Sequence, residues 1–188
     1  MEKNNLLVAV VIIVIALVLI SYPNFQKNKG LTGSATEILV GSSALIANYF
    51  AIAASNTLTT DGIKWSGLNP GDIDVNAEGN NQAGTSNYFI TVSSDSNVNV
   101  DLCVKASAPL TSGLNTIPLT DYKWDSDIVN PLLTSAIAID LAYAGADTSI
   151  APGNSDYYRF WLSVPGNQAA GTYTNTISFK GVQTGNVC

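Results

Sequence analysis

The amino-acid sequence predicts an all-β fold, a jelly-roll-like β-sandwich that follows an N-terminal hydrophobic segment. Ser, Thr, Asn and Gly together supply 68 of the 188 residues, and these residue types favour turns and strands over helices. Beyond residue 30, short segments of alternating apolar and polar residues recur between Gly, Pro and Asn, as in a sheet with one buried face. One uninterrupted apolar run, Leu6–Ile20, precedes them all.

The apolar run is at the upper limit for the core of a signal peptide and slightly short of the roughly 17–25 residues that span a bilayer. We therefore expect residues 1–30 to be a hydrophobic signal peptide or anchor with a short linker, and residues 31–188 to be the sandwich. A removed signal, a retained anchor and a pilin-like helix inside a filament all remain open. Lys27 and Lys29 favour removal, because positive charge on this flank opposes an anchor whose domain lies outside.

The elements of the sandwich can be placed in order along the chain. Residues Thr36–Asn56 fit two strands or one helix, and we predict β structure because Gly41-Ser42-Ser43 interrupts a long helix. Asn69-Pro70-Gly71-Asp72 predicts a type II turn. At least five strands are expected, with these apolar residues on their buried faces: Tyr88-Ile90-Val92; every second residue from Val98 to Ala106; Ile137-Ile139-Leu141-Tyr143; Tyr158-Phe160-Leu162-Val164; and Tyr173-Ile177-Phe179.

Charge and composition argue against several classes of function. The chain has 8 Lys and Arg, 14 Asp and Glu, and no His, for a net charge of −6. Without imidazole, neither a Ser-His triad nor a His-ligated metal can form. The few basic residues are scattered, so the patch that neutralises nucleic-acid phosphates is missing. We expect no catalytic residues and no nucleic-acid partner.

One acidic segment could hold calcium. Its oxygen-bearing side chains stand on alternate residues, so an extended chain would present them on one face, as a hard cation requires. A solvated strand face is the simpler interpretation of the same pattern. The candidate calcium ligands are Asp72, Asp74, Asn76 and Glu78, alone or together with Asp95, Asp101, Asp121, Asp125 or Asp127. No other cofactor is expected.

The two cysteines, Cys103 and Cys188, are expected to form a disulfide, because an exported protein with two cysteines usually joins them. The alternation around Cys103 places it on the solvent-facing side of its strand. Two free thiols, or a bond from Cys188 to a neighbouring subunit, are the alternatives.

The tryptophans and the asparagines indicate what the surface of the domain could bind or carry. Trp65, Trp124 and Trp161 could form an aromatic binding platform, although positions in the core or at an interface are the simpler interpretation. None of the 19 Asn residues begins an Asn-X-Ser/Thr sequence, so N-glycosylation is not expected. An exported domain without glycans can pack against copies of itself.

Three stretches together resemble a known group of proteins: residues 63–72 (IKWSGLNPGD), 88–105 (YFITVSSDSNVNVDLCVK) and 160–182 (FWLSVPGNQAAGTYTNTISFKGV). They are similar to archaeal secreted β-sandwich proteins of the TasA/camelysin-like group, which includes bundling-pilus and thread subunits. The resemblance extends from Trp65 to Val182. The missing glycosylation sequences make the bundling-pilus members the better match, since the thread-like members are heavily glycosylated.

The resemblance implies assembly by donor-strand complementation, in which an N-terminal segment of one subunit fills a strand vacancy in the next. Residues 31–41 would be the donor segment here. Thr36, Ile38, Leu39 and Val40 would form the donor strand, with either Ile38 and Val40 or Leu39 inserting. The physical requirements agree, because an all-β domain has edge strands that can pair with an added strand.

We therefore expect a secreted structural subunit of a cell-surface or biofilm-matrix filament, with copies of itself as partners and bundling between filaments as a further contact. We expect the protein to contact the membrane only through its N-terminal segment, before that segment is processed. A type IV pilin-like subunit with a helical core is one alternative, although Pro23, Gly30 and Gly33 would break its long helix. A membrane-anchored cell-envelope binding module is the other, and an enzyme is the least favoured.

Overall fold

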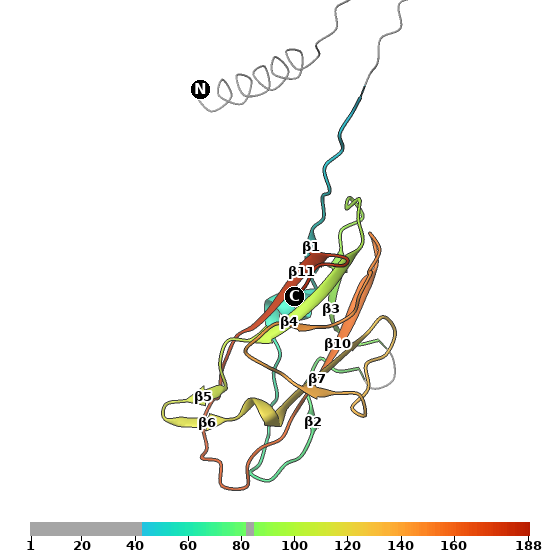
Figure 1. The fold of residues 1–188 in the computed structure, drawn as a ribbon. Coiled ribbons are helices and arrows are strands. Elements are labelled where there is room, and N and C mark those ends of the chain that lie inside the picture. The colour runs from blue at the N-terminus through green and yellow to red at the C-terminus, as the bar shows by residue number, and fades with distance from the viewer. Residues whose placement is uncertain (1–42, 82–84) are drawn as a thin grey trace, which may run out of the picture. The chain divides into compact units, whose positions relative to one another are not determined.

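The computed structural model describes residues 43–81 and 85–188, and the compact unit that carries the fold is Leu45–Cys188 (Figure 1). The expected signal or anchor at residues 1–30 and the expected donor strand, Thr36 to Val40, lie outside the described residues. Among those described, no helix has the length and apolar character needed to cross a membrane.

Within the described residues, the strands all pair antiparallel and form three sheets. The largest sheet has the order β1-β3-β10-β7-β8, with β2 also paired to β10; the second has the order β11-β4-β9; and β5 and β6 form a hairpin. The elements in chain order are β1 (Ile52–Ala54), the π-helical turn η1 (Thr57–Asp61), β2 (Val75–Asn76), β3 (Tyr88–Val92), β4 (Val100–Ala106), β5 (Leu110–Ser112), β6 (Asn115–Ile117), the 3-10 turn η2 (Leu119–Asp121), β7 (Tyr122–Asp127), β8 (Ile137–Ala138), β9 (Ala144–Gly145), β10 (Ser155–Leu162) and β11 (Ile177–Gln183).

The predicted all-β sandwich class is confirmed, because one hydrophobic core draws side chains from both larger sheets. The alternation in β3 and β10 is as predicted: Tyr88, Ile90 and Val92 are buried, as are Tyr158 and Phe160. Aromatic rings fill much of the space between the sheets. Tyr158 stacks edge-on against Phe179 of β11, with ring centroids 5.0 Å apart, and so joins the two layers.

The predicted single strand at Ile137–Tyr143 is wrong. The chain forms β8 at the edge of the larger sheet and then crosses to form β9 in the second sheet. Only Ile139 of the alternating set is buried, while Ile137 and Leu141 are each 53% exposed. Period-two alternation therefore arose here without a continuous strand.

The segment predicted as β structure over Thr36–Asn56 is only partly so. Within its described part, Ile52–Ala54 is the one strand, and residues 43–51 run without regular pairing. The Asn97 amide fixes this approach by accepting from the Tyr49 N–H at 2.7 Å and donating to the Ala47 carbonyl at 3.0 Å.

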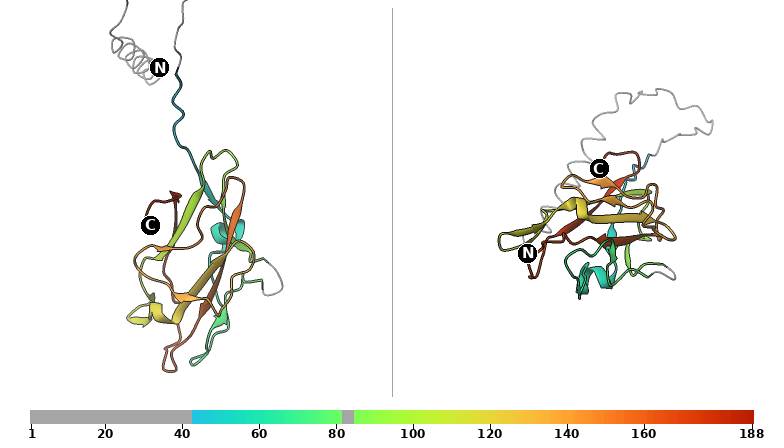
Figure 2. Two further views of the ribbon diagram at one scale, coloured as in Figure 1. Left: turned by 45° about the vertical axis from the view of Figure 1, so that its right-hand side comes forward. Right: turned by 90° about the horizontal axis from the view of Figure 1, so that it is seen from below.

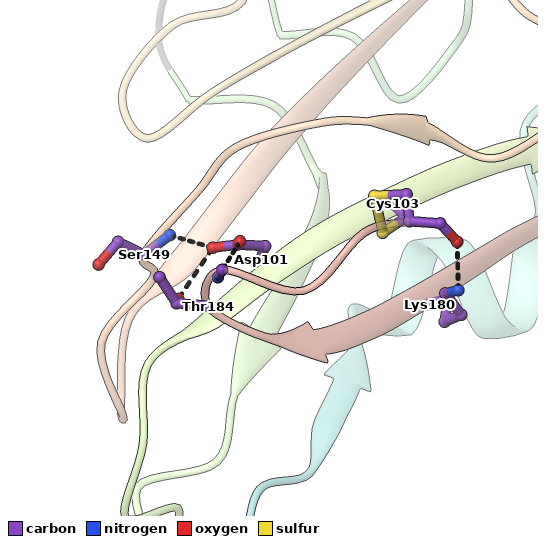
Figure 3. Close-up of a disulfide and its surroundings, with 7 residues drawn as sticks. Asp101, Cys103, Ser149, Lys180 and Thr184 are labelled. Atoms are coloured by element: carbon purple, nitrogen blue, oxygen red, sulfur yellow. Dashed lines mark hydrogen bonds between the residues drawn. A yellow bond between two sulfur atoms is a disulfide. The ribbon is translucent and has the colours of Figure 1, made fainter.

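A disulfide joins Cys103 of β4 to Cys188, the pair expected from the sequence, with Cα atoms 5.8 Å apart (Figure 3). The expected solvent-facing position of Cys103 is wrong: the residue is completely buried, because the C-terminal segment folds over the outer face of β4. Asp101 helps to hold that segment, accepting hydrogen bonds from the Thr184 hydroxyl at 2.8 Å and the Gly185 N–H at 3.0 Å.

One carboxylate, Asp156, faces the core from β10 and is fully buried. The Tyr158 hydroxyl and the backbone of Asp147 are its polar neighbours, but neither meets the geometry of a hydrogen bond to it. Burial, together with the charges of Asp147 and Asp127, raises the pKa of Asp156 to about 7, against the smaller opposing effect of the Tyr158 hydroxyl and the Asp147 backbone. An ionised carboxylate at this position is therefore costly.

Replacing this carboxylate should change how stability depends on pH. The pKa of Asp156 is higher in the folded state than in the unfolded state. The protonated carboxyl therefore contributes its full stabilisation of the folded state below about pH 4, and this stabilisation is lost as the pH rises through about 7. This pKa shift corresponds to a change of about 4 kcal/mol in the free energy of unfolding between these two pH values. We expect Asp156→Asn to be more stable than the parent at pH 8 and to have a flatter profile, measured by urea unfolding from pH 4 to 8. The exposed control Asp95→Asn should keep the parent profile.

Candidate binding groove

A groove of about 740 Å³ opens between the edge of β11 and the segment that runs from β1 to residue 68. Its lining is mainly apolar. The lining residues are Ala54, Leu58, Gly62–Trp65, Gly67, Leu68, Leu110, Ile117, Tyr122, Leu162, Gly171–Ile177 and Phe179.

The groove exists because the chain leaves the sheet early on one side. After β1, Ser55 and Asn56 favour a turn over a strand, and the chain coils into η1. The C-terminal part of β11 is covered, because Phe50 and Ile52 pack close to Gly181. A Cβ added at Gly181 would lie 3.1 Å from Ile52. The beginning of β11 has no such cover, which leaves the space open.

β11 has one unpaired edge. It ends the order of its sheet, so within the described residues only β4 pairs with it. Val100 and Leu102 of β4 direct their backbone groups toward the opposite side, to residues around β9. Antiparallel pairing therefore uses the backbone of Lys180 and its alternate neighbours, and the N–H and C=O groups of Ile177 and Phe179 point to the open edge.

The floor of the groove is aromatic and uncharged. Trp65 packs edge-on against Tyr122, with centroids 5.2 Å apart, and its indole N–H donates to the Val75 carbonyl at 2.9 Å. Burial raises the pKa of Tyr122 well above its ordinary value, so this phenol stays neutral. Lys64 is the one charged residue among the described lining residues, and Asp61 pairs with it at 3.4 Å.

A strap of residues 171–176 forms the outer wall and leads directly into β11. Thr174 exchanges two backbone hydrogen bonds with Thr111 of β5, at 3.1 and 3.0 Å. Glycine at position 171 allows this close approach, because a Cβ there would lie 2.5 Å from the Ser112 hydroxyl oxygen and 3.2 Å from the Ser112 Cβ. The Tyr173 hydroxyl donates to the Ala169 carbonyl at 2.7 Å, which holds its ring in place. The wall is thus part of the fixed structure.

The four candidate calcium ligands are not brought together. Asp74 has a positive φ of 50°, so the extended geometry on which their shared face depended is absent. Asp74 pairs with Lys123 at 2.9 Å, and Asp72 accepts from the Asn69 N–H at 2.7 Å. Glu78 lies 3.8 Å from Lys64, and the Asn76 side chain accepts from Asn80 at 3.3 Å. No cluster of three or more acidic or cysteine side chains suited to a metal occurs in the described part of the chain.

The three tryptophans do not form one platform. Trp124 and Trp161 are buried, and Trp65 alone lines the groove. Trp161 was expected opposite the core face, and it does alternate with the core residues Phe160 and Leu162, but it is only 2% exposed. Comparison of the chain with family models, with curated proteins and with solved structures finds no match.

The groove predicts a distinct fluorescence behaviour for Trp65. As the partly exposed tryptophan, it should account for most of the quenching by acrylamide, while the buried Trp124 and Trp161 contribute little. We expect Trp65→Phe to abolish most of the quenchable emission. Trp161→Phe is the matched control and should leave it; a loss shared equally by the two variants would show that the groove wall is not open to solvent.

Proposed function

We propose that this protein is a structural subunit of a secreted filament, in which an N-terminal segment of one copy inserts into the groove of the next. The unpaired edge of β11 beside an apolar groove carries the proposal. An edge strand offers backbone donors and acceptors to an added strand, and pockets beside it receive alternate side chains. The disulfide supports export, since such bonds persist in oxidising compartments.

The proposed occupant is the strand formed by Thr36 to Val40. Five extended residues cover about 17 Å, whereas the strap and the open part of β11, residues 173–179, supply seven residues of edge. The donor therefore fits within the available length. Its side chains are apolar at Ile38, Leu39 and Val40, in keeping with the uncharged floor.

The closed part of the groove sets the direction of the donor. Phe50 and Ile52 cover β11 near Gly181, so the donor enters from the strap side. Its C-terminal end must stay at that entrance, because the chain continues from there into its own domain. A donor in this direction runs antiparallel to β11.

The two ends of the sandwich make the assembly head-to-tail. Residues 45–51 join β1 at the end that carries the turn between β3 and β4, and the strap and the β5–β6 hairpin lie at the other end (Figures 1 and 2). We name these the β3–β4 end and the hairpin end. A donor that leaves one end and is received at the other makes a heterologous contact, which extends into a filament unless rotation closes it.

Removing the donor should leave a folded subunit that does not polymerise. Deletion of residues 31–41 removes no residue of the described sandwich. We expect the variant to elute as a monomer on gel filtration, with the parent β-sheet circular dichroism, and to show no filaments by electron microscopy. A synthetic peptide of residues 31–41 should then bind it and reduce acrylamide quenching of Trp65. Filaments that persist in the deletion variant would overturn the proposal.

Blocking the β11 edge should have the same effect from the receiving side. Ile177→Pro removes a backbone N–H that faces the open edge, while the pairing of β11 with β4 uses the alternate residues. We expect this variant to fold and remain monomeric. Ile177→Ala is the matched control, since it loses the same side chain but keeps the N–H, and it should still form filaments. Polymerisation by both variants would show that β11 is not the receiving strand.

A further inference from the structure

We propose a second contact between successive copies, in which the exposed residues Leu45 and Ile46 of one copy pack against Leu114 of the next. This inference rests on the proposed function, because it places the contact where the donor strand enters the groove. The partner surface is thus a second copy of this chain. The contact is separate from the strand pairing along β11.

The residues involved are unusually exposed for large apolar side chains. Leu114 is fully exposed, Leu45 is 97% exposed and Ile46 is 80% exposed. Single exposed apolar residues are ordinary on a protein surface. The position of these three, at opposite ends of the sandwich, is what relates them to one another.

Leu114 lies beside the entrance of the groove. It occupies the tight turn between β5 and β6, where Gly113 has a φ of 61°. The adjacent Ser112 contacts Gly171 of the strap, which lines the groove. The hairpin is anchored to the strap through Thr111, so the turn is held at the entrance.

Leu45 and Ile46 lie at the β3–β4 end, just before the part of the chain that Asn97 fixes through Ala47 and Tyr49. They are therefore tied closely to their own domain.

Chain continuity brings the two surfaces together. Leu45 is five positions after Val40 in the chain, which limits the distance between their Cα atoms to about 18 Å. When Val40 lies in the groove of the next copy, Leu45 and Ile46 must lie near its entrance. Leu114 is the large, fully exposed apolar residue on the hairpin beside that entrance. Packing these side chains together removes apolar surface from water at the junction.

Three side chains are far too few to hold two free subunits together, because stable interfaces bury about 1,200 Å² or more. The contact acts once the donor strand has already joined the copies, when it becomes effectively intramolecular. It is expected to restrict the angle between successive subunits and to slow their separation.

Disulfide trapping in the assembled filament tests the contact. The full chain carrying Leu45→Cys and Leu114→Cys should, on mild oxidation of filaments, give a ladder of covalent multimers on a non-reducing gel. The control pairs Leu45→Cys with Ile137→Cys: Ile137 is also exposed, but it lies on β8, at the opposite edge of its sheet from β1. The control should give no ladder. Filaments of the first variant that give none, or give no more than the control, overturn the contact.

A second measurement decides the question if the cysteine variants do not assemble. Filaments of Leu114→Ser should dissociate at a lower denaturant concentration than those of the parent and of Ile137→Ser. Equal dissociation midpoints overturn the contact. Ile177→Pro distinguishes a failure of donor-strand assembly from a failure of the second contact. Filaments formed by Ile177→Pro would contradict donor-strand assembly itself. If Ile177→Pro does not assemble, but the cysteine pair gives no ladder and Leu114→Ser keeps the parent dissociation midpoint, only the second contact is contradicted.

Discussion

The structure depends on one constraint: β11 is the last strand of its sheet and only part of its free edge is covered. Its inward side chains, Ile177 and Phe179, belong to the same core as the opposite sheet, yet they are only half-buried. Water can reach both the apolar floor and the backbone groups beside it. An added strand would form hydrogen bonds with the unpaired backbone groups of β11 and would also cover the apolar floor of the groove.

Several contacts around this edge hold the groove in a fixed shape. Contact between Tyr158 and Phe179 fixes β11 to the opposite sheet, and the strap is bonded to β5 through Thr174. On the outer face, the disulfide at Cys103 closes a separation of 85 residues, and the Lys180 ammonium donates to the Cys188 carbonyl (Figure 3). A preformed groove costs little ordering when an extended segment binds, and the flexible partner then bears most of that cost.

Tertiary context changed the meaning of several residues that the sequence pattern had placed. Cys103 was expected toward solvent, and its strand alternation is real, but the C-terminal segment covers that face. Ile137 and Leu141 follow the period of a strand, although the chain between them crosses from one sheet to the other. Asp74 adopts a positive φ and pairs with Lys123, which separates it from the other candidate calcium ligands. In each case a contact distant in sequence outweighed the local pattern.

The sequence by itself determined the all-β class, the positions of β3 and β10, and the turn at Gly71, because alternation and turn chemistry are local properties. Its apolar residues, together with the resemblance to secreted filament subunits, also led to the donor segment that we propose. Only the tertiary structure shows the groove that we propose as the receiving site. Ile177 and Phe179 look like ordinary core positions in sequence, and their open edge exists because β1 ends at Ala54 and no described strand follows β11 in its sheet. A vacancy is a property of strand order, which depends on pairing between distant segments and leaves no local signal.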